Sequence, residues 1–160
     1  MNTIHHMPEF LRSYLEEYEV HYEIIPHARD YSAQTTAADT HTPAASFAKC
    51  VLTWIDNYYA MVVTPADCMV DFRMLRDALG AGECGLVREE EMTKLFPDCE
   101  LGAEPIFGNL YDLAVIVASQ LTADETITFN AGTHEEALRM PFAEFVRLVE
   151  PQIIDCARPD

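Results

Sequence analysis

The spacing of hydrophobic residues predicts a helix near the start of the chain, followed by a short strand and a second helix. Within residues 8–20, apolar and aromatic side chains recur along one helix face: Phe10, Leu11, Tyr14, Leu15 and Tyr18. Residues 21–26 alternate between polar and apolar, which is typical of a strand. Residues 31–39 are mostly small, and we expect a helix there that Ser32 caps.

Two adjoining segments, residues 47–55 and 58–64, predict a β-hairpin. Both are rich in β-branched and aromatic side chains, and Asp56-Asn57 between them is typical of a two-residue turn. The patterns farther along predict a helix at 71–79 ended by Gly80, a strand at 85–87, a helix at 88–96, a loop at 98–110, a buried strand at 113–118, a hairpin of 126–130 and 135–140 around Ala131-Gly132-Thr133, and a last helix at 141–150.

These elements predict a single α+β domain spanning residues 1–160. No change of composition marks a linker, and no segment repeats. The hairpins require antiparallel pairing, so we expect a mixed, mostly antiparallel, barrel-like sheet surrounded by helices. A chain of this length hides roughly 70% of its unfolded surface, which is enough for a hydrophobic core.

Composition favours a cytoplasmic protein. Hydrophobic residues make up 49% of the chain, yet no apolar run approaches the roughly 18 residues that cross a bilayer. Residues 1–10 lack the basic start and apolar segment of a secretion signal, and we expect no membrane association. Five cysteines without a C-x-x-C pair favour reduced thiols, and the spacing of cysteine and histidine predicts neither a metal site nor a cofactor.

The net charge of −17 limits the nucleic acids that this chain can bind. Acidic side chains outnumber basic ones by 27 to 10, so phosphate backbones are repelled at long range and we expect no DNA partner. Local binding to one strand end stays open where a few cations converge. Only two residues are lysine, Lys49 and Lys94.

Lys49 has the most informative position in the sequence. It lies inside the first hairpin strand, where alternation places it on one face with Phe47, Val51 and Thr53. Both faces of this strand are largely apolar, and an ammonium group there is costly unless it meets an anion or reaches solvent. Two interpretations stay open: a functional cation that faces a ligand, or a lysine that extends to solvent or pairs with a structural carboxylate.

A loop rich in glycine and proline is the second candidate site. Residues 101–109 contain Gly102, Pro105 and Gly108. A loop of this kind can direct backbone N–H groups at an ester carbonyl or its oxyanion. The same composition also suits an ordinary connection between a helix and a strand.

His27 and His134 are further candidates because each lies beside a predicted strand. Each could act as acid, base or donor, or make one local hydrogen bond. No nucleophile motif such as G-x-S-x-G occurs. Its absence favours attack by water or by the substrate's own hydroxyl over a covalent intermediate.

Several segments match one known family in the same order. They are Ala48-Lys49, FPDCELG at 96–102, Pro105, FGNLY at 107–111, FNAGTH at 129–134 and FAEFVRLVEP at 142–151. With the start near His27 and the alanine-rich helix, the chain over nearly its whole length resembles the YbaK/prolyl-tRNA-synthetase-associated domain. That family includes free-standing aminoacyl-tRNA deacylases of the trans-editing type.

The resemblance implies hydrolysis of the ester that joins a wrong amino acid to the 3′ end of tRNA. The family's essential lysine falls on Lys49, which is expected to hold the phosphate or ribose region of the terminal adenosine. Its substrate loop falls on Gly102, Pro105 and Gly108, whose amides are expected to hold the amino-acid end. The other residues expected at the substrate are Phe47, Phe107, Asn109, His27 and His134.

A second hypothesis is a binding module of the same fold that has lost hydrolysis. It would recognise an aminoacyl-adenosine-like ligand or a protein partner. It rests on the strong acidity and on two departures from the family pattern. Ile106 stands where the family often has a second proline, and Ala118 where many members have an acidic residue. A metal-dependent hydrolase, a third option, lacks suitable ligand spacing.

The acidity of the chain also bears on how it binds tRNA, which is a polyanion. One expectation is recognition of the acceptor end alone, by Lys49 together with arginines: Arg29, Arg73, Arg76 or Arg139. The other is that an aminoacyl-tRNA synthetase partner supplies the tRNA-binding surface.

Overall fold

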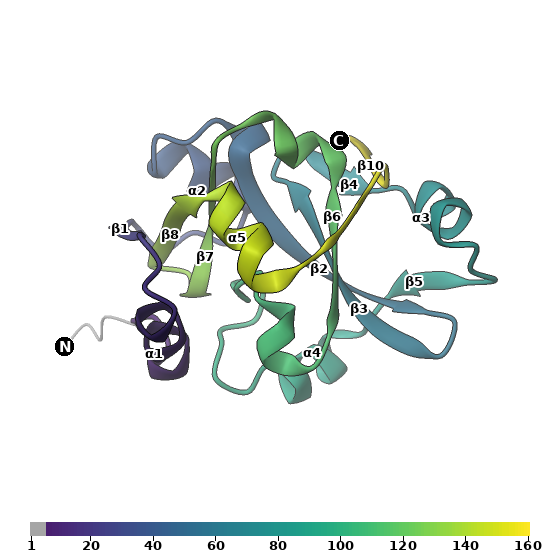
Figure 1. The fold of residues 1–160 in the computed structure, drawn as a ribbon, viewed down its shortest axis with the longest axis horizontal. Helices are drawn as coiled ribbons and strands as arrows, with labels where there is room; N and C mark the ends of the chain where they lie inside the picture. The colour runs from purple at the N-terminus through teal and green to yellow at the C-terminus, as the bar shows by residue number, and fades with distance from the viewer. Residues whose placement is uncertain (1–5) are drawn as a thin grey trace.

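The computed structural model describes residues 6–160 (Figure 1). Residues 1–5, part of the segment in which we expect no secretion signal, lie outside it. The helices are α1 (Glu9–Glu17), α2 (Ala33–Asp39), α3 (Phe72–Leu79), α4 (Glu89–Leu95) and α5 (Phe142–Val149). The strands are β1 (Glu23–Pro26), β2 (Phe47–Ile55), β3 (Tyr58–Pro65), β4 (Cys68–Val70), β5 (Cys84–Leu86), β6 (Ala114–Ala118), β7 (Thr126–Thr133), β8 (Glu136–Pro141), β9 (Gln152–Ile154) and β10 (Ala157–Pro159).

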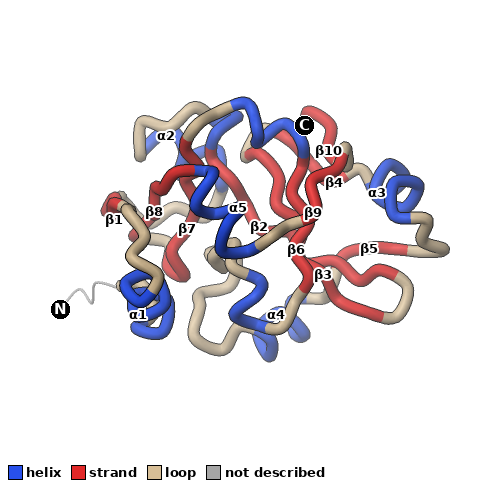
Figure 2. Tube along the Cα trace, viewed as in Figure 1, coloured by secondary structure: helices blue, strands red, loops and turns tan. Residues whose placement is uncertain are grey.

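The main sheet is mixed and lies at the centre of the molecule, with helices around it (Figure 2). Its strands follow the order β1-β8-β7-β2-β3-β6-β9, and β5 pairs with the end of β2. The pairs β2–β7, β3–β6 and β6–β9 are parallel and the other pairs are antiparallel. The predicted α+β class is confirmed. In the described chain the path ends at β1 and β9 without joining, so the sheet is not a closed barrel.

β2 and β3 form the predicted hairpin. Ile55 pairs with Tyr58, which leaves Asp56 and Asn57 as the turn. Asp56 adopts a φ of 52°, a left-handed conformation that aspartate tolerates. β2 also pairs with β7 at its start and with β5 at its end, so it is a central strand.

Both faces of the sheet carry hydrophobic core. On one face, Ala48 of β2 packs in a cluster with Phe145 of α5 and with residues of α1. On the other face, Val51 packs against the cluster that contains Leu75 of α3. Phe47 belongs to a third cluster, which includes residues of α2. Alternation along β2 thus places α2 and α3 on one face and α1 and α5 on the other.

The turn of the second hairpin differs from the prediction. We expected it at Ala131-Gly132-Thr133, but β7 continues to Thr133, which pairs with Glu136, and His134-Glu135 make the turn. The register shifts between Asn130 and Thr133, and Gly132 adopts a φ of 88°. Gly132 therefore forms a β-bulge inside the strand and is not part of the turn.

The pattern of the sequence did not predict β4, β9 and β10. Each has three residues, which is too short for a period to show. β9 pairs with β6 and β10 pairs with β4. None of the helices between residues 6 and 160 has the length and apolar character needed to cross a membrane.

Candidate active site

Lys49 lies in the first half of β2 and points to the face that α2 covers. Its side chain is half-buried, and Nζ donates to the Ala66 carbonyl oxygen at 3.5 Å, the long limit of a hydrogen bond. Within residues 6–160, no carboxylate lies within ion-pair distance of this ammonium. An ammonium has three donors, so Lys49 retains donor capacity for a ligand.

A pocket of about 320 Å³ opens beside this ammonium. Its lining comes from the start of α2, from β2, from the residue after β3 and from the residue after β10: Ser32, Ala33, Gln34, Lys49, Ala66 and Asp160. Gln34 Nε2 donates to Asp160 Oδ2 at 3.2 Å across this lining. The volume falls in the range of small-molecule sites. Phe47 is fully buried in the cluster that contains Ala66.

Two buried polar atoms without hydrogen-bond partners lie on the same face as Lys49. Thr64 pairs with Lys49 across the hairpin, and its Oγ1 has no partner in the described structure. Asn130 follows Phe129, the partner of Ala48 in the parallel pair, so it comes beside Lys49 on the same face; its Oδ1 also lacks a partner. Unpaired buried polar atoms are rare and costly, which points to a ligand or water at this place.

The predicted glycine-proline loop lies on the opposite face of the sheet. Phe107 is fully buried in the same cluster as Ala48. Cys50, the next residue after Lys49, faces this loop: burial and the nearby Glu104 carboxylate raise the pKa of its thiol. Because successive strand residues point to opposite faces, the Lys49 side chain points away from the loop. The structure does not bring Lys49 and Phe107 into one pocket.

Packing explains the remaining residues of the loop. Pro105 is buried, and a Cβ at Gly108 would lie 2.6 Å from Val115 Cγ2, so close approach to β6 requires glycine there. Asn109 is exposed and its Nδ2 donates to Tyr14 Oη of α1 at 3.0 Å. These contacts join the loop to neighbouring elements on the α1 side of the sheet.

His134 lies where the start of the loop meets the β7–β8 turn. Its Nε2 is 2.8 Å from the Leu101 carbonyl oxygen and therefore donates to it. The Glu100 carboxylate accepts from the His134 backbone N–H at 2.9 Å, from Thr133 Oγ1 at 2.8 Å and from the Arg29 guanidinium. Burial alone would raise the pKa of Glu100, but these donors outweigh burial and hold this pKa at about 2.

Gly102 contacts His134 and has its amide engaged. The φ of Gly102 is 87°, and a Cβ there would lie 3.5 Å from His134 Cε1. Its N–H donates to Glu104 Oε1 at 3.1 Å. Glu104 is 4% exposed, and burial raises the pKa of its carboxyl. The Gly102 amide is thus paired with an internal acceptor.

His27 anchors the loop before α2. Its side chain is fully buried, with Nδ1 2.7 Å from the Ala28 carbonyl oxygen and 3.6 Å from Asp30 Oδ2. Its Nε2 is buried without a partner in the described structure. The backbone N–H of His27 donates to the Glu135 carbonyl oxygen at 2.9 Å, which joins this loop to the β7–β8 turn.

Tyr31 connects the His134 region with the Lys49 pocket. It precedes Ser32, which lines the pocket and accepts from the Thr35 N–H as the predicted helix cap. The Tyr31 ring lies 4.8 Å from the His134 ring, centroid to centroid, and 76% of the residue is exposed. An exposed aromatic ring beside a pocket can stack on a base.

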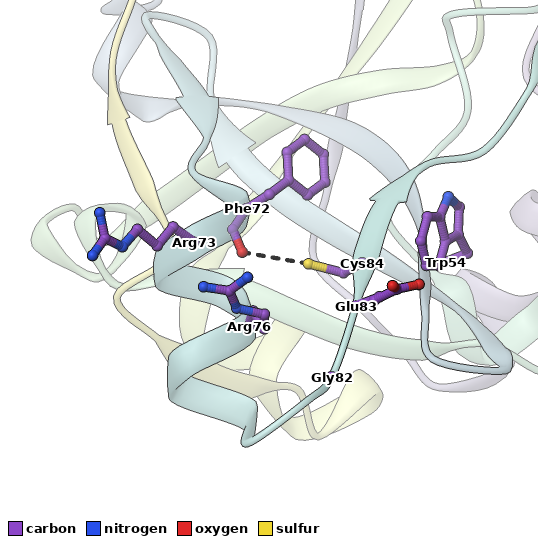
Figure 3. A pocket seen from close by; sticks show the side chains of 7 residues that line it. All are labelled: Trp54, Phe72, Arg73, Arg76, Gly82, Glu83 and Cys84. Carbon is purple, nitrogen blue, oxygen red and sulfur yellow. Dashed lines mark hydrogen bonds between the residues drawn. The ribbon is translucent and has the colours of Figure 1, made fainter.

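A second cavity, of about 500 Å³, lies at the far end of β2. Trp54 and Glu83 line it on one side, and Phe72, Arg73 and Arg76 of α3 line it on the other (Figure 3). Cys84 and Gly82 complete the lining, and Cys84 Sγ donates to the Phe72 carbonyl oxygen at 3.4 Å. Two arginines thus line this cavity, although the chain as a whole has a net charge of −17.

A family model of the aminoacyl-tRNA editing domain matches residues 27–148, well over half of the chain. The chain belongs to the aminoacyl-tRNA editing domain family. The matched range contains the Lys49 pocket apart from Asp160, and it contains both predicted histidines. A comparison with curated protein sequences finds no match.

Solved structures share the fold of this editing domain. The hypothetical protein APE2540 superimposes with a TM-score of 0.83 at 15% identity, over 94% of this chain and all of its own. A protein proposed to be a trans-editing enzyme for prolyl-tRNA synthetase gives 0.81 at 17% identity, over 92% of this chain and 94% of its own. A Marinobacter aquaeolei VT8 protein proposed to act in signal transduction gives 0.74 at 15% identity, over 95% of this chain but 31% of its own.

The predicted site residues of the editing domain therefore fall into three places. Lys49 lines the α2 pocket, and Phe47 is buried in the cluster that contains Ala66 of this pocket. His27, His134 and Gly102 surround the start of the loop and the β7–β8 turn. The third group lies on the opposite face of the sheet: Pro105, Phe107, Gly108 and Asn109. Three residues beside the first two places were not predicted: Tyr31, Thr64 and Asn130. Asn130 did leave a signal, since it is an amide inside a strand of otherwise apolar and small residues.

Proposed function

We propose that this editing domain is an aminoacyl-tRNA deacylase that hydrolyses the ester of a mischarged tRNA in trans. One observation carries the proposal: the Lys49 ammonium borders a pocket of about 320 Å³ and has no carboxylate partner among residues 6–160. A half-buried cation without a counter-ion attracts an anionic ligand. The family match supplies the substrate class, an aminoacyl-tRNA.

Lys49 is the proposed contact for the phosphate or ribose of the terminal adenosine. In that position it would hold the ester in the pocket by its charge and by its free N–H donors. The aminoacyl group carries an ammonium, which requires acceptors, and Asp160 and Asn130 Oδ1 are acceptors at or beside this pocket. Tyr31 offers an exposed ring on which the adenine can stack.

The proposed reaction needs no covalent intermediate on the protein. The oxygen of a water, or of the neighbouring ribose hydroxyl, attacks the ester carbonyl carbon. The bond from this carbon to the esterified ribose oxygen then breaks, and that oxygen takes up the proton. With water as nucleophile the products are the free amino acid and uncharged tRNA. With the ribose hydroxyl as nucleophile, the ester moves to the neighbouring oxygen before water releases the amino acid.

The loop has a different proposed role from the one that its glycines suggested. The Gly102 amide donates to Glu104, and the backbone of residues 100–102 supports His134 and the β7–β8 turn. We therefore assign to Gly102, His27 and His134 the positioning of the segment that leads into α2. The substrate contacts then come from Lys49 and the polar groups on its own face.

The same amide favours a second candidate function. A donor that is already paired cannot stabilise an oxyanion without first breaking that bond. A module that binds an aminoacyl-adenosine-like ligand or a protein partner without hydrolysis is the alternative. Calorimetry with a non-hydrolysable aminoacyl-adenosine analogue distinguishes the two when it is run beside an activity assay, because this module would bind the analogue without turnover.

The decisive experiment measures deacylation of a panel of mischarged tRNAs by the purified chain. We expect hydrolysis of at least one member, and we expect Lys49→Ala to lose most of that rate, about 100-fold or more. The matched control is Lys94→Ala, which removes the other lysine, an exposed one that pairs with Glu91 at 3.7 Å. Lys94→Ala should keep the wild-type rate. Inactivity of the wild type against the whole panel would contradict the proposal.

The proposal treats residues 1–160 as one functional unit acting in the cytoplasm. Charged tRNA is found there, and the cysteines that the structure describes are all free thiols. The partners are the acceptor end of an aminoacyl-tRNA and, where one supplies further tRNA contacts, an aminoacyl-tRNA synthetase.

A further inference from the structure

The four arginines predicted as possible tRNA contacts differ in their internal partners. Arg29 is bound to Glu100 and lies 3.4 Å from Glu135. Arg139 donates to Thr42 Oγ1 at 2.7 Å and to the Thr40 carbonyl oxygen at 3.2 Å, and it lies 3.5 Å from Glu23. The guanidinium groups of both arginines are occupied by internal partners.

Arg73 and Arg76 differ because their charge is available. Both are exposed and lie one turn apart on α3. In the described chain Arg73 has no ion pair, and Arg76 reaches only the adjacent Asp77, at 3.6 Å between exposed groups. An exposed pair of this kind contributes little and gives way readily to a ligand.

These two arginines border a cavity of about 500 Å³ with Trp54 across from them (Figure 3). Trp54 is half-buried, and a Cβ at Gly85 would lie 2.9 Å from its ring, so the ring is held against β5. Glu83 is the single acidic residue in this lining, against two arginines. A held aromatic ring beside cations suits a nucleic-acid strand, which has both phosphates and bases.

The two arginines of this cavity lie on α3, which covers the same face of the sheet as the Lys49 pocket. Trp54 belongs by alternation to the opposite face and lines the cavity at the end of β2. Lys49, Val51 and Ile55 alternate on one side of β2, and the last two pack with Leu75 of α3. Trp54 is five residues beyond Lys49, so the two sites are about 17 Å apart along the strand.

We propose that the α3 surface, defined as Arg73, Arg76 and Trp54, binds the sugar-phosphate backbone of the acceptor arm of tRNA. The inference rests on the proposed function, because it requires the 3′ end of that arm to enter the Lys49 pocket. It explains how a chain with a net charge of −17 can hold a polyanion: the contact is local and uses arginines without strong internal partners. A protein partner at this surface is the competing occupant, and tRNA-binding measurements distinguish the two.

The test compares tRNA binding by the full chain and by the double variant Arg73→Ala/Arg76→Ala. Fluorescence anisotropy with labelled, uncharged tRNA gives the affinity over a series of salt concentrations. We expect the double variant to bind about tenfold more weakly. The slope of log affinity against log salt should become shallower by about 0.7–0.9 for every phosphate that the variant no longer neutralises. In deacylation, KM for mischarged tRNA should rise while the rate on an aminoacyl-adenosine stays unchanged.

The control variant is Arg147→Ala. Arg147 is also an exposed arginine on a helix, but α5 covers the opposite face of the sheet. Arg147→Ala should bind tRNA with the affinity of the wild type and with the same slope of log affinity against log salt. Urea unfolding of each variant verifies that the changes leave the fold intact.

The outcomes separate this inference from the proposed function. Weaker binding and a shallower slope in the α3 variant alone support the inference. Equal tRNA affinity in Arg73→Ala/Arg76→Ala and in Arg147→Ala overturns the inference and favours a protein partner at this surface. A wild-type chain that does not bind tRNA also overturns it. Weaker binding by the α3 variant, in a chain that hydrolyses no mischarged tRNA, supports the surface and contradicts only the proposed hydrolysis.

Discussion

Lys49, Thr64 and Asn130 are three polar residues on the sheet face that α2 covers. The Thr64 hydroxyl and the Asn130 amide oxygen are buried without partners in the described structure, and Lys49 has only a long contact to a carbonyl oxygen. Each unpaired buried group costs about 1–3 kcal/mol of stability. A fold that keeps them together is typical of a site whose ligand supplies the missing partners.

The variant Thr64→Val tests this cost directly. Valine has nearly the shape of threonine and lacks the unpaired hydroxyl, so the free energy of unfolding should rise by about 1 kcal/mol in urea denaturation. Deacylation should fall at least several-fold if the hydroxyl contacts the substrate.

The matched control is Thr53→Val in the same strand pair. Thr53 is also fully buried, but its Oγ1 donates to the Ala60 carbonyl oxygen at 3.1 Å. Its replacement removes a hydrogen bond and should lower stability or leave it unchanged. Equal effects of the two substitutions on stability would contradict the interpretation of Thr64 as an unpaired group.

Three separate segments meet at the Glu100 carboxylate. Arg29 comes from the loop before α2, Glu100 itself from the loop after α4, and the Thr133 hydroxyl and His134 amide from the β7–β8 hairpin. Because α2 lines the Lys49 pocket, this network determines where the pocket wall begins. Glu100 is therefore a positioning residue, because it holds the loop before α2 against the β7–β8 hairpin.

Stability should depend on Glu100 in a specific pH window. The pKa of its carboxyl is about 2 in the folded chain against an ordinary value of 4.5, so folding favours the charged form. Its contribution is complete above pH 4.5 and is lost as the pH falls towards 2. In urea unfolding from neutral pH down to about pH 3, Glu100→Gln should be less stable than the wild type, with a difference that narrows below pH 4.5.

Glu89→Gln is the control for this pH series. Glu89 is an exposed residue of the first turn of α4, outside the network. The difference between this variant and the wild type should stay small across the series. A difference between Glu100→Gln and the wild type that grows with acidity would contradict the role of Glu100.

Local patterns predicted the elements that form from neighbouring residues. The bounds of β2 and the Asp56-Asn57 turn follow from alternation and turn chemistry, and the Ser32 cap accepts from the Thr35 N–H as expected. The predicted position of the β7–β8 turn was wrong because Gly132 is compatible with two backbone structures. A left-handed glycine suits either a turn or a bulge, and the pairing of Thr133 with Glu136 decides between them.

The placement of the loop relative to Lys49 required the topology. Alternation correctly separates Lys49 from Ala48 and Cys50 on β2, but the sequence does not tell which face the loop at residues 101–109 covers. Two non-local features decide it. β6, the strand after the loop, pairs in parallel with β3, and Phe107 is buried in the same cluster as Ala48. Non-local pairing of this kind leaves no periodic signal in the chain.

The charge of the whole molecule is unevenly neutralised. Acidic groups outnumber basic ones by 27 to 10, and several of the cations are already paired within the fold, among them Arg29, Arg139 and Arg147. The surplus of carboxylates repels itself in the compact state. The same surplus repels a polyanion at long range, so the proposed tRNA contacts are local ones, at Lys49 and the α3 surface.

Salt should therefore move stability and tRNA binding in opposite directions. Between about 0.01 M and 0.15 M ionic strength the screening length falls from about 30 Å to about 8 Å, which weakens the repulsion among carboxylates. The free energy of unfolding in urea should rise over this range, while tRNA affinity should fall because its few cation–phosphate contacts are screened as well. Sodium chloride and potassium chloride should act alike, since screening depends on ionic strength and not on the identity of the ion. Stability that falls with added salt, or that responds to only one of the two salts, would show that self-repulsion does not govern this fold.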